Sequence, residues 1–273
     1  MPTQTLSNHQ LEFFRSNGYI HLANVIPDHY IKAIEVSYIT LLKKYFKGKF
    51  EEFGDSEFLE NPTFNNLTHI LKTSSAVAHR AIYDSMQSMV PIKFLVNAPE
   101  VTSIVAELAQ CQPAELSNFV HNLIMAQPHD SINFIGWHQD QFNQEQVSDY
   151  EAGITAWIPM HNTPAERGAI ICCPGSHKGG HQIGARKPPS VAGSSTSYSL
   201  PEEALHSYST SVIVANRGDL VLFSMNLFHS SGINKTTLSR YTVQTSYFPV
   251  WHQHFQPGRL MYISTPSPEQ PTK

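Results

Sequence analysis

The chain has 273 residues, with a hydrophobic share of 41% and a charged share of 15%, which predicts a globular protein with a substantial buried core. A formal net charge of −4 and the absence of a long basic run argue against a nucleic-acid partner. No apolar run approaches the roughly 18 residues of a membrane span, and the N-terminus lacks the pattern of a secretory signal, so neither a membrane nor export is expected. Three cysteines, Cys111, Cys172 and Cys173, are predicted to be free thiols in a reducing, cytoplasmic setting.

The N-terminal part, 1–116, is predicted to be mainly helical. Ser7 and Gln10 form a capping-box pattern ahead of the first helix, and Gly18 is placed to end it. Apolar residues at three- and four-residue spacing indicate further helices, each with one buried face. Helices are expected over 7–18, 27–48, 75–89 and 97–110.

From about residue 117 the pattern changes to short apolar or alternating segments separated by Gly, Pro, Asn and Asp. Many short strands after a helical start predict a mainly β protein with flanking helices, in a double-sheet arrangement. Strands are expected over 118–126, 154–160, 168–173, 211–215, 220–223 and 241–248.

We interpret 1–263 as one domain whose β core covers 117–250. The segment 178–209 is rich in Gly, Ser and Pro, which is typical of a functional lid or a mobile loop, and we predict a lid. The last residues, 264–273, contain three prolines and are expected to be disordered.

A histidine and a carboxylate two residues apart, His138 and Asp140, form the first part of a candidate metal site. Residues i and i+2 of an extended segment point to the same side, so both side chains can reach one ion. A later histidine, His229, follows a predicted strand and offers a third ligand. Two histidines and one carboxylate leave positions open on a metal, as in non-haem Fe(II) oxygenases.

Arg240 adds a candidate co-substrate-binding residue to this candidate metal site. It lies eleven residues after His229 and enters the last predicted strand. A guanidinium binds a carboxylate with two parallel hydrogen bonds, which suits the distal end of 2-oxoglutarate, and Ser231 is placed to donate another. The alternative for Arg240 is an ordinary surface arginine.

These segments resemble the phytanoyl-CoA dioxygenase-like family of Fe(II)/2-oxoglutarate-dependent oxygenases. The resemblance rests on four blocks in the family's order: 137–140 (WHQD), 155–159 (TAWIP), 168–178 (GAIICCPGSHK), and 218–219 (GD) with 229–240 (HSSGINKTTLSR). It also includes the FFRSNGYI pattern at 13–20 and extends from there to about 248.

The resemblance implies a double-stranded β-helix, the jelly-roll or cupin-like core, that holds Fe(II) through His138, Asp140 and His229. It further implies that Arg240 and Ser231 bind the distal carboxylate of 2-oxoglutarate, and that O2 is the second co-substrate. The expected reaction releases succinate and CO2 while a C–H bond of the substrate is oxidised.

Four further residues are candidates for contacts with the co-substrate or substrate. Thr155 and Trp157 lie on a strand expected to line the cavity, although either can serve packing. His121 and Gln127 share one face of the preceding strand by alternation, and a core histidine is an equal alternative for His121.

The presence of Asp140 favours hydroxylation over halogenation, because halogenating members of the family that the chain resembles replace this carboxylate with a small residue. Desaturation, ring formation, demethylation and epimerisation stay open as outcomes. We expect the substrate to be a small metabolite, for example from a specialised biosynthetic pathway. An acyl-CoA substrate is the alternative within the family, and the 18 basic residues form no evident phosphate-binding run to support it. The sequence also leaves open a metal-binding cupin-like module without 2-oxoglutarate turnover and a cupin enzyme that uses another metal. It does not indicate the oligomeric state.

Overall fold

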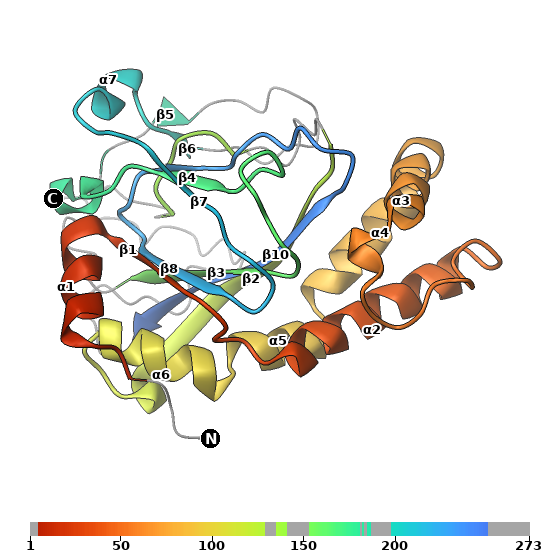
Figure 1. Ribbon diagram of the computed structural model, residues 1–273, viewed down its shortest axis with the longest axis horizontal. Coiled ribbons are helices and arrows are strands. Elements are labelled where there is room, and N and C mark those ends of the chain that lie inside the picture. Colours follow the sequence, from red (N-terminus) through yellow and green to blue (C-terminus); the bar gives the residue numbers. More distant parts are fainter. Residues whose placement is uncertain are drawn as a thin grey trace, which may run out of the picture.

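The computed structural model describes residues 5–128, 135–140, 153–180, 182, 185–186 and 198–250. Helices come first along the chain, with one short strand among them, and strands dominate the second half (Figure 1). The helices are α1 (Asn8–Asn17), α2 (Asp28–Tyr45), α3 (Pro62–Ser74), α4 (Ala76–Gln87), α5 (Val90–Val96), α6 (Pro99–Leu108) and α7 (Glu202–Leu205). Short 3-10 turns are η1 (Phe58–Glu60), η2 (Pro113–Glu115) and η3 (Ser176–Gly179).

Two antiparallel sheets form the β core of the described residues. The larger has the order β1-β8-β3-β10-β2 and the smaller β7-β4-β9, with a separate β5–β6 pair. The strands are β1 (Tyr19–Leu22), β2 (Leu116–Ala126), β3 (Ile154–Pro159), β4 (Ile170–Cys172), β5 (Ala185–Arg186), β6 (Tyr198–Ser199), β7 (Ser211–Ile213), β8 (Leu220–Ser224), β9 (His229–Ser230) and β10 (Arg240–Pro249).

The four predicted helices are present as α1, α2, α4 and α6. At α1 the Ser7 side chain accepts from the Gln10 backbone N–H, the Gln10 side chain accepts from the Ser7 N–H, and Gly18 ends the helix with φ 79°. Helices α3 and α5 were not predicted. Their signals are local: Asn61 caps α3, and a proline lies in the first turn of each helix.

The six predicted strands are also present, with small differences at their ends. Strand β1 was not predicted, because four residues directly after a helix carry little pattern of their own. It forms because β8 supplies an antiparallel partner. The predicted lid 178–209 is described only in part, and the predicted tail 264–273 lies outside the described residues.

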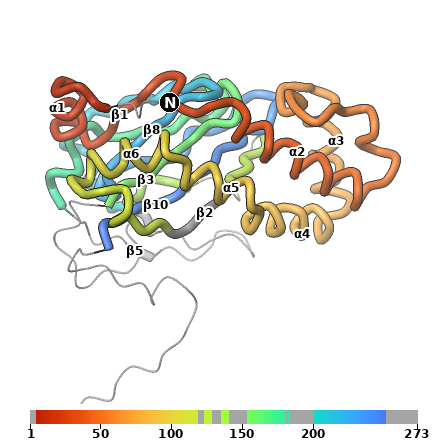
Figure 2. Tube along the Cα trace, turned by 90° about the horizontal axis from the view of Figure 1, so that it is seen from below, coloured from red at the N-terminus to blue at the C-terminus, as the bar shows by residue number. Residues whose placement is uncertain are grey.

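The larger sheet lies between helices α5 and α6 and the smaller sheet (Figure 1). In Figure 1, α5 and α6 are on one side of it, and β4 and β7 are on the other; Figure 2 shows α5 and α6 running along the sheet. Alternate residues of β3 face opposite sides of the larger sheet. Ile154, Ala156 and Ile158 join the core shared with the helices, whereas Trp157 packs with Ile170 and other residues between the sheets.

Within the described residues, no helix combines the length and apolar character needed to cross a bilayer.

Candidate metal and co-substrate site

His138 and His229 lie opposite each other across an antiparallel bridge. The N–H of His138 donates to the carbonyl of His229 at 2.9 Å, and the reverse bond is 3.0 Å. Two residues on, the N–H of Asp140 donates to the carbonyl of Met225 at 3.1 Å. This pairing brings the two sequence-distant parts of the predicted site together.

The potential ligand atoms of His138, Asp140 and His229 all lie within 4.8 Å of one another. Asp140 Oδ1 is 3.4 Å from His138 Nε2 and 3.3 Å from His229 Nε2. The three side chains are at most 11% exposed. The predicted ligands therefore form one buried cluster with two imidazole nitrogens and one carboxylate oxygen.

Backbone carbonyls orient both imidazole rings. His138 Nδ1 lies 2.7 Å from the carbonyl oxygen of Gly136, and His229 Nδ1 lies 2.9 Å from that of Leu227. A carbonyl only accepts, so each Nδ1 carries the proton and donates it. In a neutral ring protonated at Nδ1, Nε2 has a free lone pair, as metal binding requires.

The second oxygen of Asp140 is held by the wall of the larger sheet. Thr155 Oγ1 donates to Asp140 Oδ2 at 2.7 Å, and Gln244 Nε2 approaches the same oxygen at 3.3 Å. Thr155 also lies 3.2 Å from the hydroxyl of Ser246. These contacts leave Oδ1 as the oxygen that faces both histidines.

Burial and charge act against each other at this cluster. Burial alone would raise the pKa of the Asp140 carboxyl, but His229 and His138 lower it further than burial raises it, so it lies well below its ordinary value. The pKa of His138 is lowered by burial and by His229. For His229, Asp140 outweighs burial and raises the pKa. The carboxylate is thus ionised at neutral pH, as a metal ligand must be.

Arg240 begins β10 and is 3% exposed. Its Nη1 donates to the carbonyl of Gly168, while its Nε has no hydrogen-bond partner among the described residues. Burial lowers its pKa to about 10, so the side chain is still a cation at neutral pH. None of the ion pairs found among the described residues includes this buried charge.

Two more buried polar residues, Gln127 and Thr242, lack side-chain partners within the described part of the chain. Gln127, whose amide nitrogen and oxygen are both unbonded, follows Ala126, the residue paired with Arg240 in the sheet. Thr242, whose hydroxyl is unbonded, alternates with Arg240 and Gln244 on the β10 face that contacts Asp140. Sequence reasoning missed Thr242, because a threonine in a strand is an ordinary β-former.

The other predicted residues are placed as follows. Ser231 directly follows β9, and its N–H donates to the carbonyl of Ile135 at 2.9 Å. Trp157 packs in the core between the sheets. The side chain of His121 lies outside the described residues.

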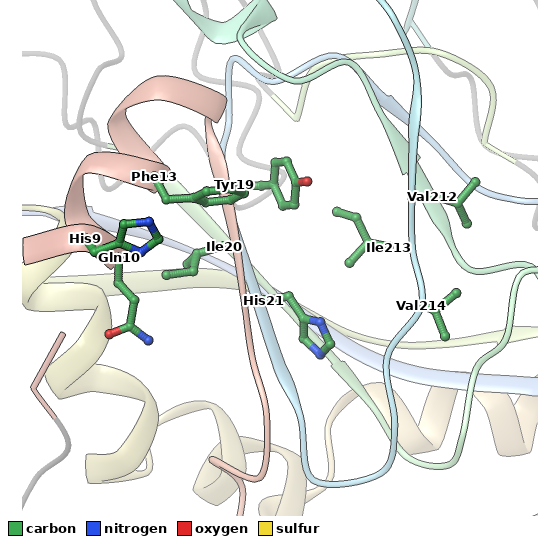
Figure 3. Close-up of a pocket in the computed structure, with 9 residues that line it drawn as sticks. All are labelled: His9, Gln10, Phe13, Tyr19, Ile20, His21, Val212, Ile213 and Val214. Carbon is green, nitrogen blue, oxygen red and sulfur yellow. The ribbon is translucent and has the colours of Figure 1, made fainter. Parts of the chain in front are cut away.

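A separate groove, with a volume of about 450 Å³, lies between α1, β1 and β7 (Figure 3). Figure 3 shows Tyr19 and His21 on one side of it and Ile213 on the other. Its lining includes neither the three clustered ligands nor Arg240. The groove therefore contributes nothing to this site.

Comparison with known proteins agrees with the fold and the clustered residues. The family model described as phytanoyl-CoA dioxygenase (PhyH) matches residues 14–242. A probable phytanoyl-CoA dioxygenase of Caenorhabditis elegans is 24% identical over 253 residues, which cover 89% of this chain and 75% of that protein.

Solved structures of similar fold include the non-haem α-ketoglutarate-dependent carbocyclase SnoK from nogalamycin biosynthesis. It is 19% identical, with a TM-score of 0.57, over 90% of this chain and 85% of that one. The epimerase SnoN, in complex with Fe3+, α-ketoglutarate and nogalamycin RO, is 16% identical, with a TM-score of 0.56. The match covers 89% of this chain and 83% of the SnoN chain. The predicted double-stranded β-helix with a helical N-terminal part is confirmed. The chain belongs to the phytanoyl-CoA dioxygenase family and is an enzyme of the non-haem iron and 2-oxoglutarate-dependent oxygenase class.

Proposed function

We propose that this enzyme uses Fe(II), 2-oxoglutarate and O2 to hydroxylate a C–H bond of a small organic metabolite. The observation that carries the proposal is the buried cluster of His138, Asp140 and His229, whose ligand atoms lie within 4.8 Å of one another. Two imidazoles and one carboxylate are the donor set of non-haem Fe(II) oxygenases, which leave positions open for co-substrates.

The residues present fit 2-oxoglutarate as well as iron. Arg240 is a buried cation with an unbonded Nε, and burying a charge without a partner is costly. A distal carboxylate would supply that partner through paired charge-assisted hydrogen bonds. Thr242 offers a further unbonded polar group on the Arg240 face of β10. The other co-substrate or substrate contacts remain proposals: Gln127, Ser231, Thr155, Trp157 and His121.

Each residue has a distinct part in the reaction that we propose. His138, Asp140 and His229 hold the metal, and Thr155 and Gln244 keep Asp140 Oδ1 directed at it. Arg240 orients 2-oxoglutarate by its distal end. When bound, iron would activate O2, the oxidant, and 2-oxoglutarate would supply two of the electrons through its oxidative decarboxylation to succinate and CO2.

We also propose that 1–263 functions as one domain. The cluster that supports this contains residues of α2, such as Ile34, together with residues of the sheet, such as Tyr241 and Val243. A continuous core of this kind couples the stability of the helical part to that of the β part.

Two alternatives concern the substrate and the chemistry. An acyl-CoA hydroxylase is favoured by the name of the Caenorhabditis elegans relative, and it would use the same iron and 2-oxoglutarate site. Turnover of a branched acyl-CoA, with 2-oxoglutarate consumption, would identify it. The carbocyclase and epimerase functions of SnoK and SnoN indicate that ring closure and epimerisation also belong in a product screen.

The first experiment is an anaerobic titration of the metal-free protein with Fe(II) and then 2-oxoglutarate, following the visible charge-transfer band of the complex. Wild type should develop the band, His138→Ala should not, and Arg240→Met should require far more 2-oxoglutarate. Arg217→Met removes another largely buried guanidinium and is the matched control, which should titrate like wild type. If wild type binds iron but develops no band, the 2-oxoglutarate proposal fails. A metal-binding module or a cupin enzyme with other chemistry then becomes the better interpretation.

A further inference from the structure

Two buried side chains hold the backbone on either side of Arg240. Arg167 donates from Nε at 3.1 Å and from Nη2 at 2.7 Å to the carbonyl of Ser239, the residue before Arg240. His161 Nε2 accepts the N–H of Tyr241, the residue after it, at 2.8 Å. The peptide that carries the proposed co-substrate anchor is therefore bonded on both sides by side chains from outside its own strand.

The segment that contains Arg167 also contacts the Arg240 side chain. Gly168, next to Arg167, accepts a hydrogen bond from Arg240 Nη1 through its carbonyl. Gly168 has φ 81°, and a Cβ at this position would lie 2.8 Å from the carbonyl oxygen of Gly232 and 3.4 Å from Arg240 Nη1. Only glycine allows this close approach without strain. Residues 167 and 168 thus hold both the backbone and the guanidinium of the anchor.

Polar groups of the helical part complete this arrangement. Arg167 Nη1 donates to Glu60 Oε2 at 2.6 Å, and Glu60 ends η1. Asn65, on α3, accepts the Ser239 N–H at 2.7 Å through Oδ1. The helical part therefore helps to fix the start of β10, where Arg240 leaves the turn.

The protonation state of His161 suits an acceptor. Its Nε2 accepts from Tyr241, so the ring proton is on Nδ1, which donates to the carbonyl of Asn162 at 2.8 Å. Burial and the nearby Arg167 guanidinium lower the pKa of His161 to about 3, so the ring is neutral at physiological pH. A neutral ring with this tautomer can accept the Tyr241 N–H permanently.

We propose that Arg167 and His161 are positioning residues for Arg240, and that Glu60 couples them to the helical part of the protein. This inference rests on the proposed role of Arg240 in binding 2-oxoglutarate. A guanidinium must be held within a fraction of an ångström to bind a carboxylate with two bonds, so support of its backbone affects affinity. Neither Arg167 nor His161 needs to touch the co-substrate or the metal.

The test measures 2-oxoglutarate binding separately from iron binding. Anaerobic Fe(II)-loaded protein is titrated with 2-oxoglutarate by the charge-transfer band, and Fe(II) affinity and thermal midpoint are measured in parallel. Arg167→Met should weaken 2-oxoglutarate binding by about tenfold or more, as loss of a supporting residue typically does, with Fe(II) affinity unchanged. Arg167→Lys should give an intermediate value, since a lysine cannot make the paired bonds to Ser239.

At His161 the rescue variant separates positioning from packing. His161→Gln retains an acceptor for the Tyr241 N–H and should bind 2-oxoglutarate nearly as wild type does. His161→Leu removes that acceptor and should weaken binding by several-fold.

Glu35→Gln is the matched control. The Glu35–Arg217 pair also links a helix to the β core, at 2.9 Å, but it bonds to none of residues 239–241 in the described part of the chain. This variant should lower the thermal midpoint without changing the 2-oxoglutarate titration.

Two results would overturn the inference. If wild type binds 2-oxoglutarate and Arg167→Met binds it equally well, Arg167 does not position the anchor, although the proposed function stands. If wild type gives no band with iron bound, the proposed function fails, and the positioning role fails with it.

Discussion

Thr155 Oγ1 lies 2.7 Å from Asp140 Oδ2, so one oxygen of the carboxylate is occupied by the sheet and the other faces both histidines. This contact gives Thr155 a structural partner that its position in the sequence did not suggest. A threonine expected to line the cavity is thus bonded to a proposed metal ligand.

We predict that Thr155→Val lowers Fe(II) affinity by about tenfold, because Asp140 loses the hydroxyl that fixes its rotation. Fe(II) affinity is measured by anaerobic titration against a competing chelator. Thr68→Val is the control, since Thr68 is a buried threonine whose hydroxyl donates to the carbonyl of Asn65, within α3. Unchanged Fe(II) affinity in Thr155→Val would contradict the orienting role.

Thr242→Val should stabilise the protein while weakening 2-oxoglutarate binding. The Thr242 hydroxyl is buried without a partner among the described residues, and replacing it with a methyl group removes a desolvation cost of about 1–3 kcal/mol. If the hydroxyl bonds to 2-oxoglutarate, the same change raises the dissociation constant several-fold. Thermal melts and the anaerobic titration measure the two effects. A lower melting point together with unchanged binding would show a purely structural threonine.

Asp140→Ala should abolish tight Fe(II) binding, because it removes the one anionic ligand of the cluster. Fe(II) content after anaerobic loading and gel filtration is the measurement. Added formate or acetate should partly restore binding, since a small carboxylate can enter the space that the side chain leaves. Full Fe(II) loading of Asp140→Ala without any additive would disprove the proposed ligand set.

His161 predicts a pH dependence of stability. Its folded pKa of about 3 is below the ordinary 6.5, so between these values the unfolded state binds more protons than the folded state. The contribution of His161 to the free energy of unfolding is therefore fully present above pH 6.5. Between pH 6.5 and about pH 3 it falls by about 1.4 kcal/mol for each pH unit of acidification.

Urea unfolding of wild type and His161→Gln at pH 7.5 and 5.0 checks this prediction. Glutamine does not titrate, so the loss of stability on acidification should be smaller in the variant by roughly 2 kcal/mol. Equal losses in the two proteins would show that His161 does not titrate on unfolding in this range.

Much of the local structure could be predicted because its causes are local. The α1 cap depends on Ser7, Gln10 and Gly18, all within one short segment. The His138–Asp140 spacing places two potential ligands on one side of an extended segment regardless of the rest of the fold. Strand β1 could not be predicted in this way, since it needs β8 as its partner. Helix α5 has a local signal in its first-turn proline, but it is too short to show a clear period.

The sequence by itself determined the helical and β halves, the candidate ligands and the family to which the chain belongs. Only the tertiary structure decided that His138 pairs with His229, that Thr155 bonds to Asp140, and that Arg167 and His161 flank Arg240. The physical reason is the register of the sheets. Capping and periodicity act between residues a few positions apart. Hydrogen bonds between strands instead bring together side chains separated by tens of residues. The type of a single residue does not indicate which distant residue will be its partner.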